Sequence, residues 1–108
     1  MEDVVLFRAS EIFSALSNPV RLRIVELLCK EERSVGEIAT EMAIGTSGAS
    51  QHLSLLARCG ILVSTARGTS RRYKVRGPRV EAILKLIEEF CHVHVLYGVP
   101  AGDPEESA

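Results

Sequence analysis

The chain has 108 residues, the length of a single domain, and its 13 basic and 14 acidic side chains nearly cancel, leaving a net charge of -1 at pH 7. The total charge therefore gives no sign of a nucleic-acid ligand. No apolar run approaches the roughly 20 residues that span a bilayer, no signal peptide is recognised, and three cysteines are an odd number for a disulfide scaffold, so we expect a cytoplasmic protein without a membrane partner.

The first part of the chain is predicted to be helical. Apolar residues at near-helical spacing indicate a helix over residues 4–16. Asn18 is a typical N-cap and Pro19 suits a first helical turn, so a second helix is expected from there to about Lys30. This second helix is too apolar for a surface position, which favours the centre of the domain. Residues 30–33 are all charged and are expected to form a turn.

The next two predicted helices have the pattern of a helix-turn-helix. Ser34 and Glu37 have the spacing of a capping box at the start of a short helix over about 35–42. A further helix is expected over about 46–59, and Gly60 ends it. A short helix, a turn and a helix with a polar N-terminal end form the unit that enters the major groove of DNA.

A basic β-hairpin is expected to follow. Strands are predicted at about 61–66 and 70–76, because polar and apolar residues alternate on both sides of a turn at 67–69. Residues 42–80 contain no acidic side chain but hold seven of the 13 basic ones. Basic residues are therefore concentrated in this stretch and acidic residues lie outside it. This local distribution, unlike the total charge, favours a nucleic-acid partner.

A last helix is predicted from Arg79 to about His94, with a wide apolar stripe. This helix and the one at 4–16 carry more apolar surface than a core of about 100 residues can absorb, so we expect them to pair with a second copy of the chain. A symmetric dimer would place two recognition helices about 34 Å apart, one turn of B-DNA. Residues 1–97 would form the domain, and the acidic segment 98–108 a disordered tail.

The candidate DNA contacts lie at the start of the 46–59 helix and in the hairpin. Hydroxyl groups can bond phosphates or base edges, a Gln amide can pair with adenine, and a helix N-terminus attracts phosphate. Cations of the hairpin would reach phosphates or a narrow minor groove. An ordinary solvated cap and a solvated hairpin tip are the alternative interpretations. The predicted set is Thr46, Ser47, Ser50, Gln51, His52, Arg67, Thr69, Arg71 and Arg72, of which His52 could instead pack on the core, while Tyr73 is expected to point inward.

The chain resembles the ArsR/SmtB family of bacterial and archaeal winged-helix repressors over about residues 8–94. The resemblance is carried, in order, by ALSNPVRLRIVELL, SVGEIA, TSGASQHLSLLARCGIL and ARGTSRRYKV. It implies a mainly α winged helix-turn-helix with a small β-hairpin, in the order α-α-α-α-β-β-α, and a homodimer formed by the first and last helices. It also implies repression at double-stranded operator DNA, relieved by an effector. The family's base contacts fall on Thr46, Ser47, Ser50 and Gln51, and Gly45 stands where the family often has a Ser or Asp cap.

Two effector chemistries of the family can be compared with this chain. The Cys-x-Cys motif of arsenic and cadmium sensors is absent at residues 33–37, and the early His of zinc sensors is absent near residues 79–81. A partial set of ligand types for zinc or a softer ion remains near the end of the last helix, and a dimer partner could complete it. This set is Cys91, His94, His92 and Glu88.

Another branch of the family senses persulfide or oxidants through two cysteines. The run from Glu88 to Cys91 resembles the second of these positions, whereas the first position is Glu26 here and Cys29 lies one helical turn further on. A thiol switch also requires a lowered pKa and access to solvent. Cys91 and Cys29 are therefore candidate effector thiols, although a small core residue is the favoured interpretation of both Cys29 and Cys59.

Two other function classes stay open. A winged helix can bind protein instead of DNA, which would favour acidic or apolar residues on the exposed face of the 46–59 helix, where this chain has Thr, Ser and Gln. An enzyme would use Cys91 and a nearby His as nucleophile and base, but the sequence shows neither evident oxyanion donors nor pocket-forming bulk. No enzymatic activity is expected.

Overall fold

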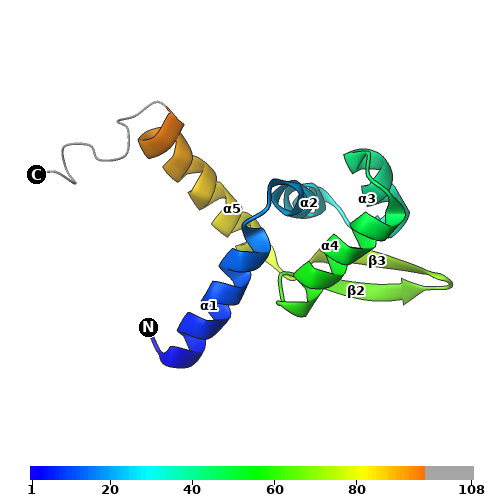
Figure 1. The fold of residues 1–108 in the computed structure, drawn as a ribbon, viewed down its shortest axis with the longest axis horizontal. Helices are drawn as coiled ribbons and strands as arrows, with labels where there is room; N and C mark the ends of the chain where they lie inside the picture. The colour runs from blue at the N-terminus through cyan, green and yellow to red at the C-terminus, as the bar shows by residue number, and fades with distance from the viewer. Residues whose placement is uncertain (97–108) are drawn as a thin grey trace, which may run out of the picture.

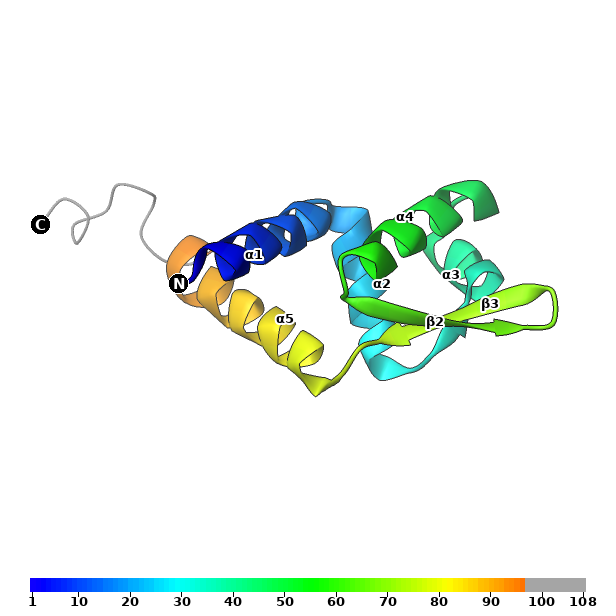
Figure 2. The same ribbon diagram turned by 90° about the horizontal axis from the view of Figure 1, so that it is seen from below.

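A computed structural model describes residues 1–96, so the segment expected to form a tail at 98–108 lies outside the described residues. In chain order the elements are α1 (Asp3–Leu16), α2 (Pro19–Lys30), β1 (Arg33–Ser34), α3 (Val35–Met42), α4 (Thr46–Arg58), β2 (Leu62–Arg67), β3 (Ser70–Val75), α5 (Pro78–Cys91) and the π-helical segment η1 (His92–Leu96). Figures 1 and 2 show α2, α3, α4 and the sheet gathered in one body, with α1 and α5 projecting from the same side of it.

The core lies between α2, α3, α4 and the sheet. The prediction that the second helix is central is confirmed, because Ile24, Val25 and Leu28 of α2 are buried. The N-terminus of α2 is fixed as expected, since the Asn18 Oδ1 atom accepts hydrogen bonds from the backbone N–H groups of Val20 (2.8 Å) and Arg21 (3.0 Å). The other members of the core are Ala15, Ile38, Ala39, Ala49, Leu53, Leu56, Ile61, Leu62 and Tyr73.

The sheet has three antiparallel strands in the order β1-β3-β2, one more than the sequence predicted. Residues 30–33 were expected to form a turn, but Arg33 and Ser34 form the strand β1 and pair with Tyr73 and Arg72 of β3. A strand of two residues shows no alternation of its own. Its partner lies about 40 residues further along the chain, so only the tertiary structure defines it.

The last helix differs from the prediction at its end. An α-helix was expected to about His94, but α5 is α-helical only to Cys91 and continues from His92 to Leu96 as a π-helix. A sequence pattern read at a period of 3.6 residues does not distinguish one wider turn from an α-helical one.

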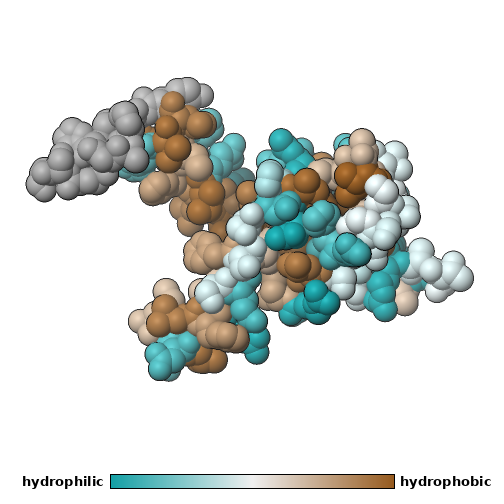
Figure 3. All heavy atoms as spheres, in the orientation of Figure 1, coloured by the Kyte–Doolittle hydropathy of each residue, from teal (hydrophilic) through white to brown (hydrophobic). Residues whose placement is uncertain are grey.

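Large apolar side chains remain exposed on α1 and α5. On α5 none of the residues is buried, and Leu86 is 64% exposed. Figure 3 shows apolar patches on these two projecting helices. Apolar surface of this extent marks an interaction site rather than a solvated face. The exposed residues are Val4, Val5, Leu6, Phe7 and Phe13 of α1 and Ile83, Leu86, Ile87 and Phe90 of α5. None of the described helices is long and apolar enough to cross a membrane.

Candidate nucleic-acid interface

The first helix of the helix-turn-helix is fixed at both of its ends. The capping box is present, since the Glu37 N–H donates to the Ser34 Oγ atom (3.1 Å) and the Ser34 N–H donates to the Glu37 Oε1 atom (2.8 Å). The Ser34 N–H holds the pKa of the Glu37 carboxyl below its usual value. At the other end Ala43 takes a left-handed conformation (φ 56°) and the Ile44 N–H donates to the Ala39 carbonyl (3.0 Å). The turn into α4 is therefore short and fixed.

The second helix of the helix-turn-helix, α4, begins at Thr46 as predicted, although Gly45 has no side chain to cap it. The amides of the first turn consequently have no side-chain acceptor from the N-cap residue, which suits an anion at this end of the helix. Ala49, Leu53 and Leu56 are buried and hold the inner face of α4 on the core. The exposed outer face carries Thr46, Ser47, Ser50 and Gln51, while His52 is half-buried beside them.

The hairpin of β2 and β3 presents its cations at an exposed tip. The chain reverses through Gly68, whose φ of 61° is open to glycine without strain. Arg67, Thr69 and Arg71 are all exposed. The Arg71 Nη1 atom donates a hydrogen bond to the Ser64 Oγ atom across the hairpin (2.9 Å), which holds this side chain close to the strands.

The structure brings the start of α4 and the hairpin together. An open groove of about 740 Å³ is lined by Thr46 and Ser50 of α4 and, from the hairpin, by Thr69, Arg71 and Arg72. Ser47, Gln51 and His52 belong to the same turns of α4 but do not line this groove. One surface therefore combines the hydroxyls of a helix N-terminus with a hairpin cation, as a major-groove helix flanked by a wing requires.

Two basic residues of the acid-free stretch, Arg72 and Arg76, contact other parts of the fold. Arg72 forms ion pairs with Glu32 and Glu37, which precede the acid-free stretch in the sequence. The Arg76 Nε atom donates to the Gly60 carbonyl (2.7 Å) at the base of the hairpin. Counting cations within the acid-free stretch therefore overstates the number whose side chains have no partner within the fold.

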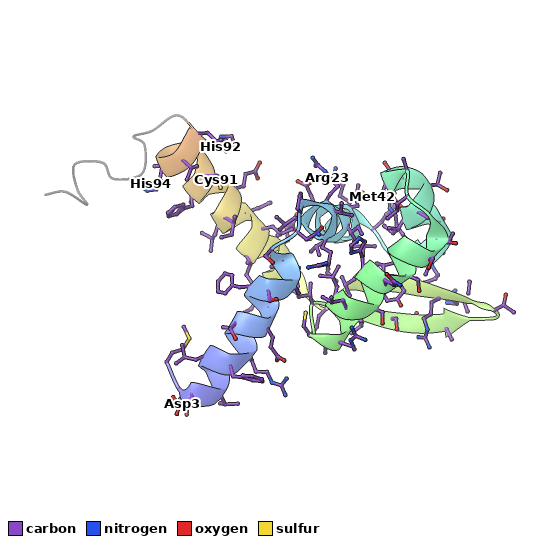
Figure 4. All side chains as sticks on the ribbon, viewed as in Figure 1. Asp3, Arg23, Met42, Cys91, His92 and His94 are labelled. Atoms are coloured by element: carbon purple, nitrogen blue, oxygen red, sulfur yellow. The ribbon has the colours of Figure 1, made fainter. Side chains whose placement is uncertain are left out.

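The candidate metal ligands near the end of α5 do not come together as a site. Figure 4 shows His92 and His94 on opposite sides of the last turns, with Cys91 beside them. The ring of His94 lies 4.9 Å from that of Phe90, centroid to centroid. Within the part of the chain that the structure describes, no group of three or more His, Cys, Asp or Glu side chains could hold a metal ion. Glu88 instead lines a groove between α2 and α5.

The two candidate effector thiols lie in different surroundings. Cys29 is half-buried and lines the groove between α2 and α5, where burial, followed by the charges of Glu81 and Glu26, raises the pKa of its thiol. A raised pKa reduces the thiolate fraction at neutral pH, which is the opposite of what a thiol switch requires. Cys91 is a free, half-buried cysteine that does not line this groove.

Comparisons with known proteins agree with this geometry. The model of the bacterial regulatory protein arsR family matches residues 18–64. An HTH-type transcriptional regulator of Mycobacterium tuberculosis is 34% identical over 86 residues, covering 78% of this chain and 75% of the relative. A probable mercury resistance operon repressor of Streptomyces lividans is 32% identical, covering 71% and 62% of the two chains. The homodimeric winged helix-turn-helix DNA-binding domain from Mycobacterium bovis, solved by NMR, superposes with a TM-score of 0.80 at 27% identity, covering 92% and 94%.

Proposed function

Because the chain belongs to the arsR family of bacterial regulatory proteins, we propose that it is a homodimeric repressor that binds a specific double-stranded operator. It is a transcriptional regulator with a winged helix-turn-helix, and its relatives are regulators rather than enzymes. The observation that carries the proposal is the groove in which the polar N-terminal turns of α4 face the wing, the hairpin of β2 and β3. The name of the Streptomyces relative supports repression.

Each part of this surface has a distinct task in the proposal. Gln51 reads a base edge, because its amide offers a donor and an acceptor that match adenine. The hydroxyls of α4 and the amides of its first turn position the helix on phosphates. Arg71 binds a phosphate beside the groove. The other proposed contacts are Thr46, Ser47, Ser50, His52, Arg67 and Thr69.

The Arg71→Ala variant is expected to lose the phosphate contact of Arg71, one contact in each subunit of the dimer. The slope of log affinity against log salt changes by about 0.9 for each phosphate neutralised, so the slope should become shallower by about 1 per contact. The loss of affinity should be similar on operator and scrambled DNA, because phosphate contacts carry no sequence information. Fluorescence anisotropy at several salt concentrations measures both quantities.

Arg58→Ala is the matched control for this experiment, because Arg58 is an exposed cation at the opposite end of α4 and does not line the groove. Its salt slope should equal that of the unsubstituted protein. A slope that Arg71→Ala leaves unchanged would contradict the phosphate contact.

The homodimer of this proposal uses the exposed apolar faces of α1 and α5. Burial of these faces against a second copy would remove their contact with water, which is the main driving force of association. The domain would extend over residues 1–97. The solved homodimer from Mycobacterium bovis supports the assembly by its similarity to nearly the whole described chain.

The effector that releases the operator is proposed to act at the end of α5. Both candidate chemistries, a thiol modification and the binding of a zinc-like or softer metal ion, would involve Cys91, which directly follows the exposed apolar Phe90 of the dimer-forming helix. A charge or a ligand bond there would disturb the packing of α5. In the thiol chemistry Cys29 would be the second cysteine. In the metal chemistry His94, His92 and Glu88 would need ligands from the second copy, because they form no site within the described part of one chain.

Cys91→Ser is expected to keep operator affinity in the reduced, metal-free state and to lose release by the effector. The measurement is anisotropy of the bound operator during titration with Zn²⁺ and, separately, with a persulfide donor. Cys59→Ser is the control, because Cys59 directly follows α4 and donates its thiol hydrogen to the Leu56 carbonyl (3.4 Å) of that helix. This variant should respond as the unsubstituted protein does. Release of Cys91→Ser at the same concentrations would place the effector site elsewhere.

A further inference from the structure

Arg71 and Arg72 are consecutive in sequence but point to opposite faces of β3. Arg71 shares the face of Tyr73, which packs into the core. Arg72 projects from the other face, where its Nε atom donates to the Glu32 Oε2 atom (2.9 Å). Its Nη2 atom donates to the Glu32 carbonyl (3.3 Å) and to the Glu37 Oε1 atom (3.4 Å). Three hydrogen bonds therefore join this one guanidinium to the segment that precedes α3 and to α3 itself.

One partner of Arg72, Glu37, is itself part of the helix-turn-helix. Glu37 closes the capping box of α3, and Ser34, the other member of that box, pairs with Arg72 in the sheet. A second ion pair joins the Arg33 Nη1 atom to the Glu41 Oε1 atom near the end of α3 (3.0 Å). The wing is thus connected through β1 and Arg72 to the helix that packs against α4.

The surroundings of Arg72 make its contact with Glu32 stronger than that of a fully solvated pair, whereas Glu37 is exposed. The side chain of Arg72 is 29% exposed and that of Glu32 is 33% exposed, so water and salt screen their interaction only in part. The planar guanidinium is also bound at two of its nitrogen atoms, which fixes its orientation. Arg72 also lines the groove beside α4, but a phosphate there would have to compete with these carboxylates for its Nε and Nη2 atoms.

We propose that Arg72 is a positioning residue that fixes the angle of the wing against α3, and not a DNA-contacting cation. The wing latch, defined as Arg72 with Glu32 and Glu37, holds Arg71 beside the start of α4. This inference rests on the proposed DNA-binding function, but the latch itself also has a consequence in the free protein.

Hydrogen exchange of the DNA-free protein tests the latch without DNA. In Arg72→Ala the backbone amides of residues 63–71 should exchange faster, because the wing loses its attachment to α3. The amides of α2 should keep their protection, which shows that the fold is intact. Lys74→Ala is the matched control, because Lys74 is an exposed cation on the same strand, and this variant should exchange as the unsubstituted protein does. Unchanged exchange of the wing in Arg72→Ala would overturn the latch.

The direction in which DNA affinity changes distinguishes a latch from a phosphate contact. Glu32→Ala removes an acid, so ordinary electrostatics would strengthen DNA binding. The latch predicts the opposite: Glu32→Ala should lose DNA affinity by about tenfold, as Arg72→Ala does. The double variant Glu32→Ala, Arg72→Ala should bind no more weakly than either single variant. The salt slope should stay unchanged in all three, whereas Arg71→Ala reduces it.

Two results of the binding experiment have separate meanings. Stronger binding by Glu32→Ala together with a reduced salt slope for Arg72→Ala would overturn the latch and make Arg72 a phosphate contact. Equal binding of operator and scrambled DNA by the unsubstituted protein would instead refute the proposed function, and hydrogen exchange would then decide on the latch alone.

Discussion

Leu86→Glu is expected to convert the dimer into monomers and to reduce operator affinity by about 100-fold or more, since two linked recognition helices bind far more tightly than one. Leu86 is 64% exposed on α5, so its replacement removes little packing within the chain. In the proposed dimer, however, the glutamate would have to be buried against apolar side chains of the second copy, where an unpaired charge is strongly unfavourable.

Light scattering after gel filtration measures the mass of this variant, and anisotropy on operator DNA measures its affinity. Lys85→Glu is the control, because it introduces the same carboxylate one residue earlier at a side chain that is exposed and charged in the structure. This control should remain a dimer. A Leu86→Glu protein that is still a dimer with full operator affinity would refute the assignment of the α5 face.

Gln51→Ala is expected to remove sequence preference while leaving non-specific binding intact. A bidentate contact between a side chain and a base contributes about 1–3 kcal/mol of discrimination, and a dimer makes it once in each half-site. The loss should appear on operator DNA and not on scrambled DNA. The salt slope should stay the same, because the amide neutralises no phosphate.

Arg71→Ala provides the matched comparison for Gln51→Ala, because both side chains are exposed on the proposed DNA surface but differ in charge. Gln51→Ala should therefore lose sequence preference, whereas Arg71→Ala should lose part of the salt dependence of binding. Equal losses of affinity on every sequence for both variants would count against base reading by Gln51.

The helical part of the fold was predictable because its signals are local. Asn18 caps α2, Ser34 and Glu37 form the capping box of α3, and α4 begins at Thr46, all as the sequence indicated. The inward position of Tyr73, which is 4% exposed, followed from alternation along β3. These features depend on residues within a few positions of one another, and a single sequence carries that information.

The features that were missed depend on pairs distant in the sequence. Strand β1 exists because residues 33 and 34 meet β3, and Arg72 finds its acids at Glu32 and Glu37 for the same reason. The stretch without acids suggested that Arg72 was available to DNA, because no local pattern reveals a partner 40 positions away. The raised pKa of Cys29 similarly arises first from burial and then from the charge of Glu81 on α5, which lines the same groove.

The central claim, that this chain reads a DNA sequence as a dimer, is tested most directly by selection from a pool of random-sequence duplexes with the reduced protein. The account predicts enrichment of an inverted repeat whose half-sites lie about 10 base pairs apart, centre to centre, or a multiple of that spacing, since the two recognition helices of a dimer face successive turns of the major groove. A selected pool with no common motif, bound no more tightly than the starting pool, would contradict it.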